Sequence, residues 1–413
     1  MLTKAPRGTK DVTPNEVYKW QYIENAMREV CSCFGYSEIR VPVFEHTELY
    51  VRGVGNTSDV VQKEMYTFDD KGGRSITLRP EGTSGVVRAY LENNLYAEAA
   101  PSKLFYMMSC YRYEKPQAGR LREFNQFGVE AFGAASAEVD AEVISLAKAL
   151  FERLNFDNLE IFINSVGCPS CRAEYNKKLV AYFNEYTDTL CETCMTRLEK
   201  NPMRIIDCKN PDCKTIGHSA PMIIDEQCGD CEEHFEKVKV LLDKMGIPYG
   251  IDPTIVRGLD YYTTTVFEVK SDGMVVTGGG RYNYLVEELG GQPTPGIGFG
   301  LGMERLIMAL DKKNLFPEKP GGTDVYIASI GENANLFSQK LVYDLRLCGV
   351  RCEKDLMTRS VKAQMKYADK IGARYVVVLG DDEINSGTAR LKNMSTGEQE
   401  EVALDMLADK LTK

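Results

Sequence analysis

Hydrophobic residues near the N-terminus recur at the spacing of an amphipathic helix, which we expect within residues 14–35. The positions on its apolar face are Val17, Trp20, Ile23, Met27 and Val30. Residues 37–44 (SEIRVPVF) then predict a strand. Pro42 assigns this strand to an edge or a bulge, because proline has no backbone N–H to donate.

Two stretches of alternating apolar and polar residues, 103–114 and 123–132, flank the polar loop 115–122. This pattern predicts a long antiparallel hairpin. Between residues 168 and 231 the pattern changes, because helical segments separate eight of the thirteen cysteines. We expect an inserted domain there.

After this insertion the sequence again favours strands and glycines. Strands are predicted at 258–269, 274–280 and 296–302, and a helix follows from about Met303. Residues 314–323 have the proline and glycine content of a linker.

Beyond the linker, segments alternate in the order β, α, β, α, β, β, which predicts a small α/β domain of about ninety residues. The segments are 324–330, 335–347, 350–354, 360–371, 375–379 and 388–394.

The composition is that of a globular protein of two or three domains, with 413 residues of which 43% are hydrophobic and 27% charged. A net charge of −10 argues against a partner held mainly by bulk electrostatics, although a local basic face stays compatible with RNA. The charged N-terminal residues lack the apolar core of a signal peptide, and no run of about 18 apolar residues predicts a membrane span. We expect a cytoplasmic protein without membrane contact, whose cysteines are reduced or bound to metal.

One face of the strand at 123–132 carries polar side chains that suit a small ligand. Successive residues of a strand point to opposite faces, so Gln126, Gly128 and Glu130 share one face while the intervening apolar residues face the core. Gln126 and Glu130 are about 13 Å apart along the strand, and Gly128 leaves an open floor between them. A molecule with a polar group at each end would fit this groove, whereas an ordinary solvated face is the alternative that the strand alone favours.

The first strand of the hairpin carries Arg112 and Glu114, and the adjoining loop contains Lys115, Arg120 and Arg122. Arginine presents a rigid fork of donors that matches phosphate oxygens. These residues suit a polyphosphate or an RNA end, and solvated surface charge is an equal alternative.

Glycine occupies every second position from Gly296 to Gly302, which leaves one face of that strand without side chains. Such a face admits a large flat molecule or, alternatively, the tight packing of a helix. Arg305 follows in the first turn of a helix, where free backbone N–H groups also favour an anion. Because no GxxxxGK[ST] is found and these glycines lie within a strand, the pattern favours an ATP site on an antiparallel sheet.

Several segments together resemble the class II aminoacyl-tRNA synthetases and, within that class, the histidyl-tRNA synthetases. YRYEKPQAGRLREFNQFGVE resembles motif 2 of the class, GIGFGLGMERL resembles motif 3 and FGYSEIRVPVFE resembles motif 1. RGTKDV, LRPEGT, RGLDYY and GGGRY are similar to signatures of the histidyl-tRNA synthetases. The resemblance covers nearly the whole chain, and the combination is far more specific than any single motif.

The resemblance implies the class II synthetase fold, with an α+β catalytic domain on a mainly antiparallel sheet built from residues 1–167 and 236–318. It implies a helical, cysteine-rich insertion at 168–235 and an α/β anticodon-binding domain at 323–413. The implied activity is that of a histidine–tRNA ligase, which uses ATP and Mg²⁺ to activate L-histidine and then transfers it to tRNA(His). A homodimer is implied as well, with Pro42 at the core of the motif 1 interface.

Roles for individual residues follow from the same resemblance. Arg112 and Arg257 are expected to be catalytic and to bind the α-phosphate region of ATP, while Glu114 and Arg305 complete the ATP site, Arg305 at the γ-phosphate. The residues implied at the amino and carboxylate end of histidine are Glu81, Thr83 and Gln126. Those implied around its imidazole are Glu130, Tyr262 and Tyr282, and Tyr261 completes the histidine site. The residues implied in contact with the acceptor end of the tRNA are Gln117, Arg120 and Arg122.

One position departs from the family pattern, because Asn125 stands where the family usually has histidine. By strand alternation Asn125 points away from Gln126, so we expect a local change of packing and no loss of activity. A pocket that hydrogen-bonds an imidazole rejects apolar analogues by ~10⁴ or more without proofreading. We therefore expect no editing site in the insertion.

Two other functions are weighed against this one. A non-catalytic paralogue, such as the regulatory subunit of ATP phosphoribosyltransferase, would bind histidine as a sensor, but it typically lacks the C-terminal module and an intact RGLDYY. A synthetase for another amino acid, such as proline or threonine, would share the hairpin and the final domain, and RGLDYY and Glu130 argue against it.

The cysteines of the insertion form pairs that the resemblance does not account for. The pairs are Cys168/Cys171, Cys191/Cys194, Cys208/Cys213 and Cys228/Cys231, and three of them have CxxC spacing. Eight thiolates suffice for two four-cysteine zinc sites, and reduced, partly buried thiols are an equal alternative. His218 and His234 are further candidate ligands, although surface or capping roles are more usual for them.

In the C-terminal domain, Lys362 and Lys366 lie one helical turn apart and are candidates for phosphate contact. A solvated helix face is the equal alternative. Contact of this domain with RNA is inferred from the resemblance, because its charge is nearly balanced.

Overall fold

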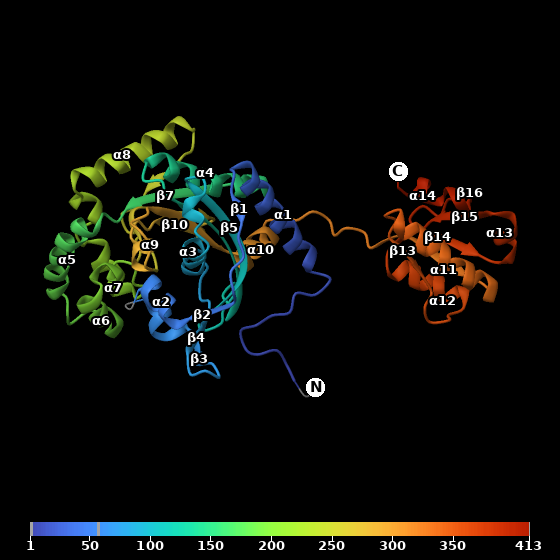
Figure 1. Ribbon diagram of the computed structural model, residues 1–413, viewed down its shortest axis with the longest axis horizontal. Coiled ribbons are helices and arrows are strands. Elements are labelled where there is room, and N and C mark those ends of the chain that lie inside the picture. The colour runs from blue at the N-terminus through green and yellow to red at the C-terminus, as the bar shows by residue number, and fades with distance from the viewer. Residues whose placement is uncertain (1–2, 56–57, 413) are drawn as a thin grey trace. The chain divides into compact units, whose positions relative to one another are not determined.

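The computed structural model describes residues 3–55 and 58–412. The chain divides into two units, Met1–Phe316 and Pro317–Lys413, and each is built on a sheet of its own (Figure 1). The division falls within the predicted linker, 314–323. The separation of the first unit into a catalytic domain and an insertion stays a prediction.

The first unit contains strands and helices throughout, with a run of helices from α5 to α8. Up to the hairpin its elements are α1 (Val17–Cys33), β1 (Ser37–Glu38), β2 (Phe44–His46), α2 (Thr47–Val54), the π-helical turn η1 (Val60–Glu64), β3 (Tyr66–Asp69), β4 (Ser75–Leu78), α3 (Thr83–Glu92), η2 (Leu95–Ala97), β5 (Ser102–Tyr111) and β6 (Glu123–Phe132). After the hairpin they are α4 (Ala137–Arg153), β7 (Leu159–Ser165), α5 (Pro169–Asn184), α6 (Glu192–Lys200), η3 (Pro202–Ile205), α7 (Pro211–His218), η4 (Ile223–Glu226), α8 (Gly229–Lys244), β8 (Gly250–Ile251), β9 (Thr263–Ser271), β10 (Met274–Arg281), α9 (Leu285–Glu288), β11 (Gly296–Gly302) and α10 (Met303–Lys312).

The large sheet of the first unit has the strand order β1-β5-β6-β11-β10-β9-β7-β8. Its inner strands, from β5 to β7 in this order, all pair antiparallel, whereas β1 and β8 pair parallel at the two edges. The predicted hairpin is formed by β5 and β6, and its register places Tyr106 opposite Gly128. The prediction of a mainly antiparallel sheet is confirmed.

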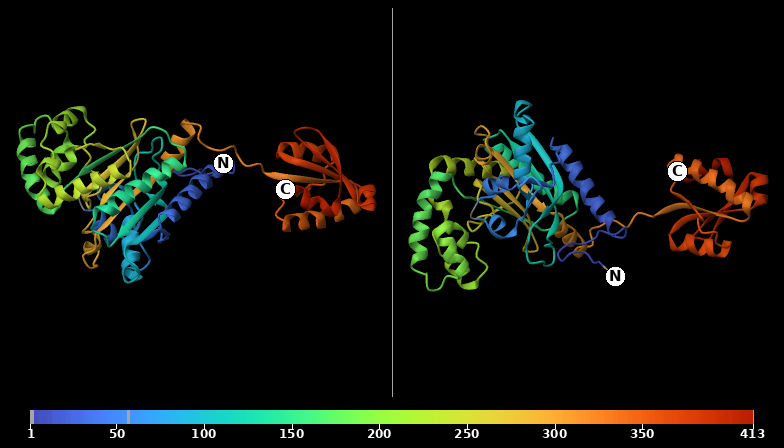
Figure 2. Two further views of the ribbon diagram at one scale, coloured as in Figure 1. Left: turned by 90° about the horizontal axis from the view of Figure 1, so that it is seen from above. Right: turned by 60° about the horizontal axis from the view of Figure 1, so that its bottom comes forward.

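One face of this sheet packs against helices and forms the main core. Phe127, Val129 and Ala131 of β6 are buried there together with residues of α1, α4, α8 and α10. Figure 2 shows α4 and α8 lying side by side over this face. The apolar set of β6 therefore faces the core as predicted, because strand side chains alternate with a period of two. The opposite face packs against α3 and carries the polar side chains of the candidate site.

The strand predicted at 37–44 is interrupted, so this prediction was wrong in part. β1 pairs with β5 in the large sheet, whereas β2 pairs with β4 in a separate sheet of order β2-β4-β3. Between β1 and β2, Nη1 of Arg79 donates to the carbonyl oxygens of Val41 and Pro42 at 2.7 and 3.1 Å. A side chain thus takes the place of a partner strand, at a segment where proline has no N–H to donate.

The strand predicted at 258–269 begins later, at Thr263, because a loop precedes it. The loop follows Arg257, whose φ of +57° lies in a region that residues other than glycine seldom adopt. From this backbone position Nη1 of Arg257 donates to Oε1 of Glu268 on β9 at 2.7 Å. The loop therefore directs an arginine onto the sheet.

Between β7 and β8 the chain is helical and packs around a small core of its own, while the bounds 168–235 of the insertion stay a prediction. Tyr175, Phe183 and Ile205 are buried in this core, beside several of the cysteines. The last helix, α8, continues to Lys244 and packs against α4. The insertion therefore returns directly into the main core of the first unit.

The second unit contains the predicted strands and helices in the predicted order, with α13 added between the last two of them and β16, η5 and α14 added at the end. Its elements are β12 (Thr323–Ser329), α11 (Glu332–Leu347), β13 (Cys352–Lys354), α12 (Val361–Lys370), β14 (Ala373–Leu379), α13 (Asp381–Ser386), β15 (Thr388–Asn393), β16 (Gln399–Ala403), η5 (Leu404–Met406) and α14 (Leu407–Leu411). The sheet order is β13-β12-β14-β15-β16. β13 and β14 both pair parallel with β12, whereas β15 pairs antiparallel with β14 and β16 antiparallel with β15.

Helices cover both faces of the second sheet. Val325 and Ile327 of β12 pack against α11 and α14, whereas Tyr326 and Ala328 pack against α12. Strand β16 was not predicted, because its sequence (QEEVA) is mostly polar and exposed at the sheet edge. Within the described part of both units, no helix is long and apolar enough to cross a membrane.

Candidate active site

A cleft of about 600 Å³ opens on the face of the large sheet that α3 shares. It is formed by the loop before α3, the hairpin loop and strand β6, the loop before β9, strands β9 to β11 and the start of α10, together with residues from 59–64 and 204–209. The predicted site residues that line it are Glu81, Thr83, Arg112, Glu114, Arg120, Gln126, Glu130, Arg257, Tyr261, Tyr262, Tyr282 and Arg305. Of the described residues predicted on the hairpin loop, Lys115, Gln117 and Arg122 lie outside this lining.

Glu130 is fully buried at one end of this cleft. Its carboxylate accepts hydrogen bonds from Oγ1 of Thr83 at 2.7 Å, from the Tyr106 hydroxyl at 3.2 Å and from the Tyr282 hydroxyl. Burial raises the pKa of Glu130 to about 8, against the lowering effect of the hydrogen bonds from Tyr282 and Thr83. The carboxyl group is therefore able to change its charge near neutral pH when a basic ligand approaches.

The loop before α3 is held in place by carboxylate and amide groups. Glu81 accepts hydrogen bonds from the backbone N–H groups of Thr83 at 2.7 Å and Ser84 at 2.9 Å, which satisfies free donors in the first turn of α3. Oε1 of Gln126 accepts from the backbone N–H of Gly82 at 2.9 Å. These bonds fix Glu81 and Gln126 side by side along the cleft.

Tyr261, Tyr262 and Tyr282 form an aromatic wall beside Glu130. The ring centroid of Tyr261 lies 4.7 Å from that of Tyr262 and 5.5 Å from that of Tyr282. Burial raises the pKa of all three phenols, so each keeps its proton and is available as a hydrogen-bond donor.

Arg112 follows directly after β5 and is held from two sides. Its Nε donates to the carbonyl oxygen of Pro80 at 2.7 Å, and its guanidinium carbon lies 5.4 Å from the centroid of the Phe124 ring. These contacts orient the guanidinium group at the wall of the cleft that Arg112 lines.

Arg257 is half-buried beside β9, β10 and the tyrosine wall, with 18% of its side chain exposed. Its guanidinium carbon lies 5.7 Å from the Tyr262 ring centroid, in addition to the bond with Glu268. A Cβ atom at Gly278 would lie 2.5 Å from Nη1 of Arg257. Glycine at this position on β10 is therefore required for the arginine to lie across the sheet.

Arg305, in the first turn of α10, faces a second arginine across the cleft. Burial, and after it the charge of Arg120, lowers the pKa of Arg305. Arg120 is itself paired with Glu114, with Nη1 and Oε2 3.4 Å apart. Two guanidinium groups that repel one another favour an anion between them.

The other predicted residues of the hairpin loop lie apart from the cleft. Gln117 is exposed and closes a turn with Arg120 through paired backbone hydrogen bonds of 3.1 and 2.9 Å. The guanidinium carbon of Arg122 stacks 3.8 Å from the Tyr113 ring centroid, and its backbone N–H donates to the carbonyl oxygen of Gly8 at 2.7 Å. The loop is thereby tied to the N-terminal RGTKDV segment.

The alternating glycines of β11 lie beneath side chains of the site, so the expectation of a bare face was wrong for most of the row. The side chains over Gly296, Gly298 and Gly300 are those of Tyr282, Glu130 and Gln126, respectively. A Cβ atom at each of these glycines would lie 2.3, 2.1 and 2.7 Å from them. At Gly302, in contrast, a Cβ atom would meet nothing within 4 Å.

The open floor expected at Gly128 is likewise filled. The Tyr106 ring, from the cross-strand neighbour on β5, would lie 2.4 Å from a Cβ atom at Gly128. A large side chain opposite a glycine leans over the space that the missing side chain leaves. The glycines of this sheet therefore make room for the protein's own recognition groups as well as for a ligand.

Asn125 contacts the start of α10. Its backbone N–H and Nδ2 both donate to Oε1 of Glu304, at 2.8 and 3.1 Å, and Oγ of Ser109 donates to its Oδ1 at 3.1 Å. Burial raises the pKa of Glu304, which lines the cleft beside Arg305. The expectation that Asn125 leaves the activity intact stays a prediction.

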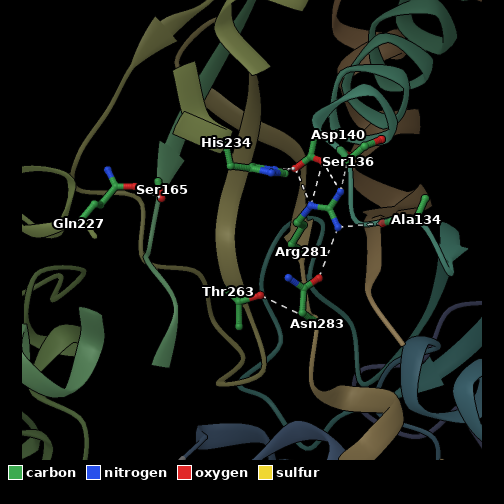
Figure 3. Close-up of polar contacts among 9 residues, drawn as sticks. All are labelled: Ala134, Ser136, Asp140, Ser165, Gln227, His234, Thr263, Arg281 and Asn283. Atoms are coloured by element: carbon green, nitrogen blue, oxygen red, sulfur yellow. Dashed lines mark hydrogen bonds and ion pairs between the residues drawn. The ribbon is translucent and has the colours of Figure 1, made fainter. Parts of the chain in front are cut away.

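Arg281, which precedes Tyr282 in the chain, forms a buried ion pair with Asp140 (Figure 3). Arg281, the neighbour of Tyr282, donates from Nε and Nη2 to Asp140 on α4 at 2.9 and 2.5 Å. Nη2 also donates to the carbonyl oxygen of Ser136 at 2.6 Å, and Nε2 of His234 lies 3.2 Å from Oδ1 of Asp140. The pair ties the end of β10 to α4 and α8.

Some residues of the site were not predicted from the sequence. They are Tyr106, Glu268 and Glu304, together with Arg204 and Lys209 of the insertion, both of which line the cleft. The hairpin pairing would have indicated Tyr106, because counting back from the loop places it opposite Gly128. No local pattern indicates that Arg204 and Lys209 reach the cleft.

The eight cysteines of the insertion gather into two groups. The groups are Cys168, Cys171, Cys228 and Cys231, and Cys191, Cys194, Cys208 and Cys213. Within each group all sulfur atoms lie within 4.8 Å of one another. Among the described residues, His218 and His234 belong to neither group.

Comparison with known families supports this arrangement over the length of the chain. The family model of histidyl-tRNA synthetase matches residues 8–170 and 218–306, and that of an anticodon binding domain matches residues 324–413. The histidine–tRNA ligase of Acetivibrio thermocellus is 58% identical over 418 residues, which cover 100% of both chains. That of Clostridium perfringens is 57% identical, with 98% of both chains covered.

Solved structures agree in fold. Apo histidyl-tRNA synthetase of S. aureus matches with a TM-score of 0.85 and 41% identity, and the match covers 100% of both chains. A protein described as an ATP phosphoribosyltransferase regulatory subunit/histidyl-tRNA synthetase, from Bacillus halodurans C, matches with a TM-score of 0.65 and 22% identity, over 92% of this chain and 98% of that one. The second likeness concerns the fold alone.

Proposed function

Because the chain belongs to the histidyl-tRNA synthetase family, we propose that it is a histidine–tRNA ligase. First, the carboxylate of L-histidine attacks the α-phosphorus of ATP, which gives histidyl-adenylate and pyrophosphate. The histidyl group then passes to the terminal ribose of tRNA(His). The observation that carries the proposal is a single cleft that holds the buried Glu130–Tyr282 pair together with Arg112, Arg257 and Arg305.

The buried end of the cleft is the proposed imidazole site. An imidazole offers an N–H donor and a basic nitrogen, which the Glu130 carboxylate and the phenols of Tyr262 and Tyr282 complement. Tyr261 packs against both phenol rings and excludes water. Ligands without these polar groups leave buried partners unpaired, so the site discriminates against them by a factor of ~10⁴ or more. We therefore assign no editing role to the insertion.

The amino and carboxylate groups of histidine are assigned to the neighbouring part of the cleft. Glu81 and Thr83 supply oxygen acceptors for the ammonium group. Gln126, whose Oε1 is held by the backbone of Gly82, turns its amide N–H groups to the carboxylate. This end adjoins the arginines, so the nucleophilic oxygen lies toward the phosphates.

ATP is assigned to the part of the cleft with the highest positive charge. Arg112 and Arg257 bind the α-phosphate region and Arg305 the γ-phosphate, while Glu114 lies at the same wall. Mg²⁺ would enter with ATP and would neutralise part of the phosphate charge, and the carboxylate of Glu114 is the group of the assigned ATP site that would hold it. Gly302 is the open position of β11, where a flat base or ribose can approach the backbone.

Charge neutralisation and alignment account for the first reaction. Both reactants are anions, so guanidinium groups fixed in advance lower the barrier more than a protein base does. The contacts of Arg112 with Pro80, and of Arg257 with Glu268, hold these donors in place before ATP binds. For the transfer step we assign no residue as base, because phosphate or substrate groups serve that purpose.

Contacts with tRNA are assigned to two regions. The hairpin loop carries Gln117, Arg120 and Arg122, next to the cleft where the acceptor end must arrive. The C-terminal unit, which matches the anticodon binding domain, is assigned to the anticodon, with Lys362 and Lys366 as candidates for phosphate contact. A reaction that serves translation takes place in the cytoplasm.

A homodimer is part of the proposal. In this family motif 1 is expected at the subunit interface, and here Pro42, Val43 and Phe44 are exposed, as is Phe68 on β3 of the same three-stranded sheet. Val43, Phe44 and Phe68 expose 40%, 57% and 49% of their surface, apolar area that a partner subunit would cover. Light scattering after gel filtration tests this, and a monomer at micromolar concentration would contradict it.

ATP–pyrophosphate exchange with each of the standard amino acids tests the proposed activity. We expect exchange with histidine alone, followed by histidylation of tRNA(His) when the tRNA is added. Exchange with no amino acid would instead support a histidine sensor. Exchange with proline, threonine or another amino acid would support a synthetase of different specificity.

A further inference from the structure

We propose that the insertion holds two structural zinc ions, each bound by four cysteine thiolates. The first site consists of Cys168, Cys171, Cys228 and Cys231, and the second of Cys191, Cys194, Cys208 and Cys213. The proposed ligation reaction uses neither site. The family model leaves residues 171–217 unmatched, so all four cysteines of the second site lie outside its matched ranges.

The distances between sulfur atoms are those of a tetrahedral metal site. Zn–S bonds of about 2.3 Å place the sulfurs of a tetrahedron about 3.8 Å apart. In the first group, Sγ of Cys168 lies 3.5 Å from that of Cys171 and 4.0 Å from that of Cys228, and Cys171 lies 3.9 Å from Cys231. In the second group the Cys191–Cys208 distance is 3.9 Å. A disulfide, with sulfurs about 2.05 Å apart, does not account for groups of four.

The helices of the insertion favour thiolates at both sites. Cys171, Cys194, Cys213 and Cys231 are each the third residue of a helix, in α5, α6, α7 and α8, respectively. Free backbone N–H groups and the helix dipole stabilise negative charge at this position. Each site therefore lies between two helix N-termini, which offset the excess negative charge of four thiolates around one Zn²⁺.

Backbone N–H groups also donate directly to sulfur within each group. The N–H of Cys228 donates to Sγ of Cys171 at 3.1 Å, and the N–H of Cys191 donates to Sγ of Cys213 at 3.2 Å. Both bonds run from one cysteine pair to the other, so they set how the two pairs face each other. Support of this kind around the ligands is usual for metal sites, and reduced thiols in a core do not need it.

Zinc is the ion that this ligand set favours. Four soft thiolates in a tetrahedron select Zn²⁺ or iron, and a structural zinc site is closed by four protein ligands. The remaining cysteines of the chain provide a contrast, because Cys33 and Cys348 are exposed and lie in neither group. Their thiols serve as internal controls for the eight proposed ligands.

The first site joins the two ends of the insertion. Cys168 and Cys171 stand where the chain leaves β7 for α5, and Cys228 and Cys231 stand where α8 begins its return to the core. A metal here closes the insertion into a loop and fixes the direction in which it leaves the sheet.

The second site fixes a wall of the cleft. Cys208 stands between Asp207 and Lys209, which both line the cleft, as does Arg204. Nη1 of Arg204 donates to the carbonyl oxygen of Arg257 at 3.2 Å. The metal therefore holds the segment that contacts the backbone of a proposed catalytic residue.

Metal analysis of the full-length protein, produced with added zinc and purified with a reductant, tests the proposal. We expect two equivalents of zinc per chain, one for each group. After exchange into Co²⁺, the visible d–d bands of a tetrahedral tetrathiolate complex and a sulfur-to-cobalt charge-transfer band are expected. Substoichiometric zinc, bound iron in its place, or cobalt bands of octahedral oxygen ligation would overturn the proposal.

Variants assign the two equivalents to the two groups. Cys168→Ser with Cys228→Ser should lose one equivalent, Cys191→Ser with Cys213→Ser should lose the other, and Cys33→Ser with Cys348→Ser should keep both. If the folded protein of either ligand variant keeps both equivalents of zinc, the site assigned to its substituted cysteines is wrong. The cobalt spectrum of the unsubstituted protein decides the question even if a ligand variant fails to fold.

Discussion

The guanidinium group of Arg281 and the carboxylate of Asp140 form an ion pair in which both side chains are almost fully buried, with 1% and 0% exposed. Arg281 ends β10 and Asp140 lies in the first turns of α4, so the pair connects a strand of the site to a helix of the main core. The ring of the next residue, Tyr282, reaches Glu130 on the other face of the sheet. The position of a side chain of the candidate site thus depends on an ion pair outside the lining of the cleft.

Removal of one partner of this pair should destabilise the first unit strongly. Arg281→Met leaves the Asp140 carboxylate buried without its main counter-charge, which we expect to cost about 3–5 kcal/mol. Urea unfolding followed by the fluorescence of Trp20, the single tryptophan, reports on this unit. Arg153→Met, which breaks the exposed pair with Glu29, is the control and should cost less than about 1 kcal/mol. Equal losses for the two variants would contradict the assigned role.

The pKa of Glu130 predicts how stability depends on pH. In the folded protein the Glu130 carboxyl group has a pKa of about 8, whereas in the unfolded chain its pKa is 4.5. Between these values the folded state binds the extra proton, so this group lowers stability by about 1.4 kcal/mol for each pH unit as the pH rises. Glu130→Gln removes this titrating group. The free energy of unfolding of the variant, relative to that of the unsubstituted protein, should therefore increase as the pH rises. A constant difference in urea unfolding across this range would contradict the raised pKa.

The Tyr282 hydroxyl should matter for histidine and little for ATP. Tyr282→Phe removes a donor to Glu130 inside the proposed imidazole site, which we expect to raise the KM for histidine roughly 10-fold to 100-fold. The KM for ATP should change little, since the phosphates are assigned to the arginines. Tyr284→Phe, at an exposed position two residues further on, is the matched control. Similar increases in both KM values would argue against an imidazole site at this end.

Arg112 should act on the rate of adenylate formation. Its side chain is oriented by Pro80 and Phe124 before any ligand binds, so Arg112→Ala removes a donor that is fixed in place. We expect kcat for pyrophosphate exchange to fall by ~10²–10³, the usual loss for one such donor. Arg153→Ala, on the surface of α4, should leave kcat unchanged. A higher KM for ATP with a normal kcat would mean that Arg112 contributes to ATP binding and not to the rate of adenylate formation.

Substitution by alanine should affect stability at one glycine of β11 and ATP binding at another. A Cβ atom at Gly298 would lie 2.2 Å from the carbonyl oxygen of Val129, a backbone atom that cannot move without disturbing the sheet. Gly298→Ala should therefore destabilise the protein by roughly 1–3 kcal/mol or more. Gly302→Ala meets nothing within 4 Å, so its unfolding midpoint should stay normal while the KM for ATP rises. Normal ATP binding in Gly302→Ala would remove the nucleotide from this part of the strand.

Features with a local cause were predicted well from the sequence. The alternation along β6 separates Phe127 and Val129, which are buried in the core, from Gln126 and Glu130, which line the cleft. The α1 helix, the hairpin and the order of elements in the C-terminal unit follow from equally local periods. Predictions failed where a distant side chain intervened, as Arg79 does between β1 and β2 and Tyr106 does over Gly128.

By itself the sequence determined which residues can meet a ligand on one strand, and which cysteines form pairs, because strand period and CxxC spacing are properties of neighbouring residues. Only the tertiary structure decided how the four cysteine pairs combine into two groups, and that Arg204 reaches the carbonyl of Arg257. It also decided that the glycine row lies under Tyr282, Glu130 and Gln126. The physical reason is that these contacts join segments far apart in the chain, and packing of the whole unit sets their distances.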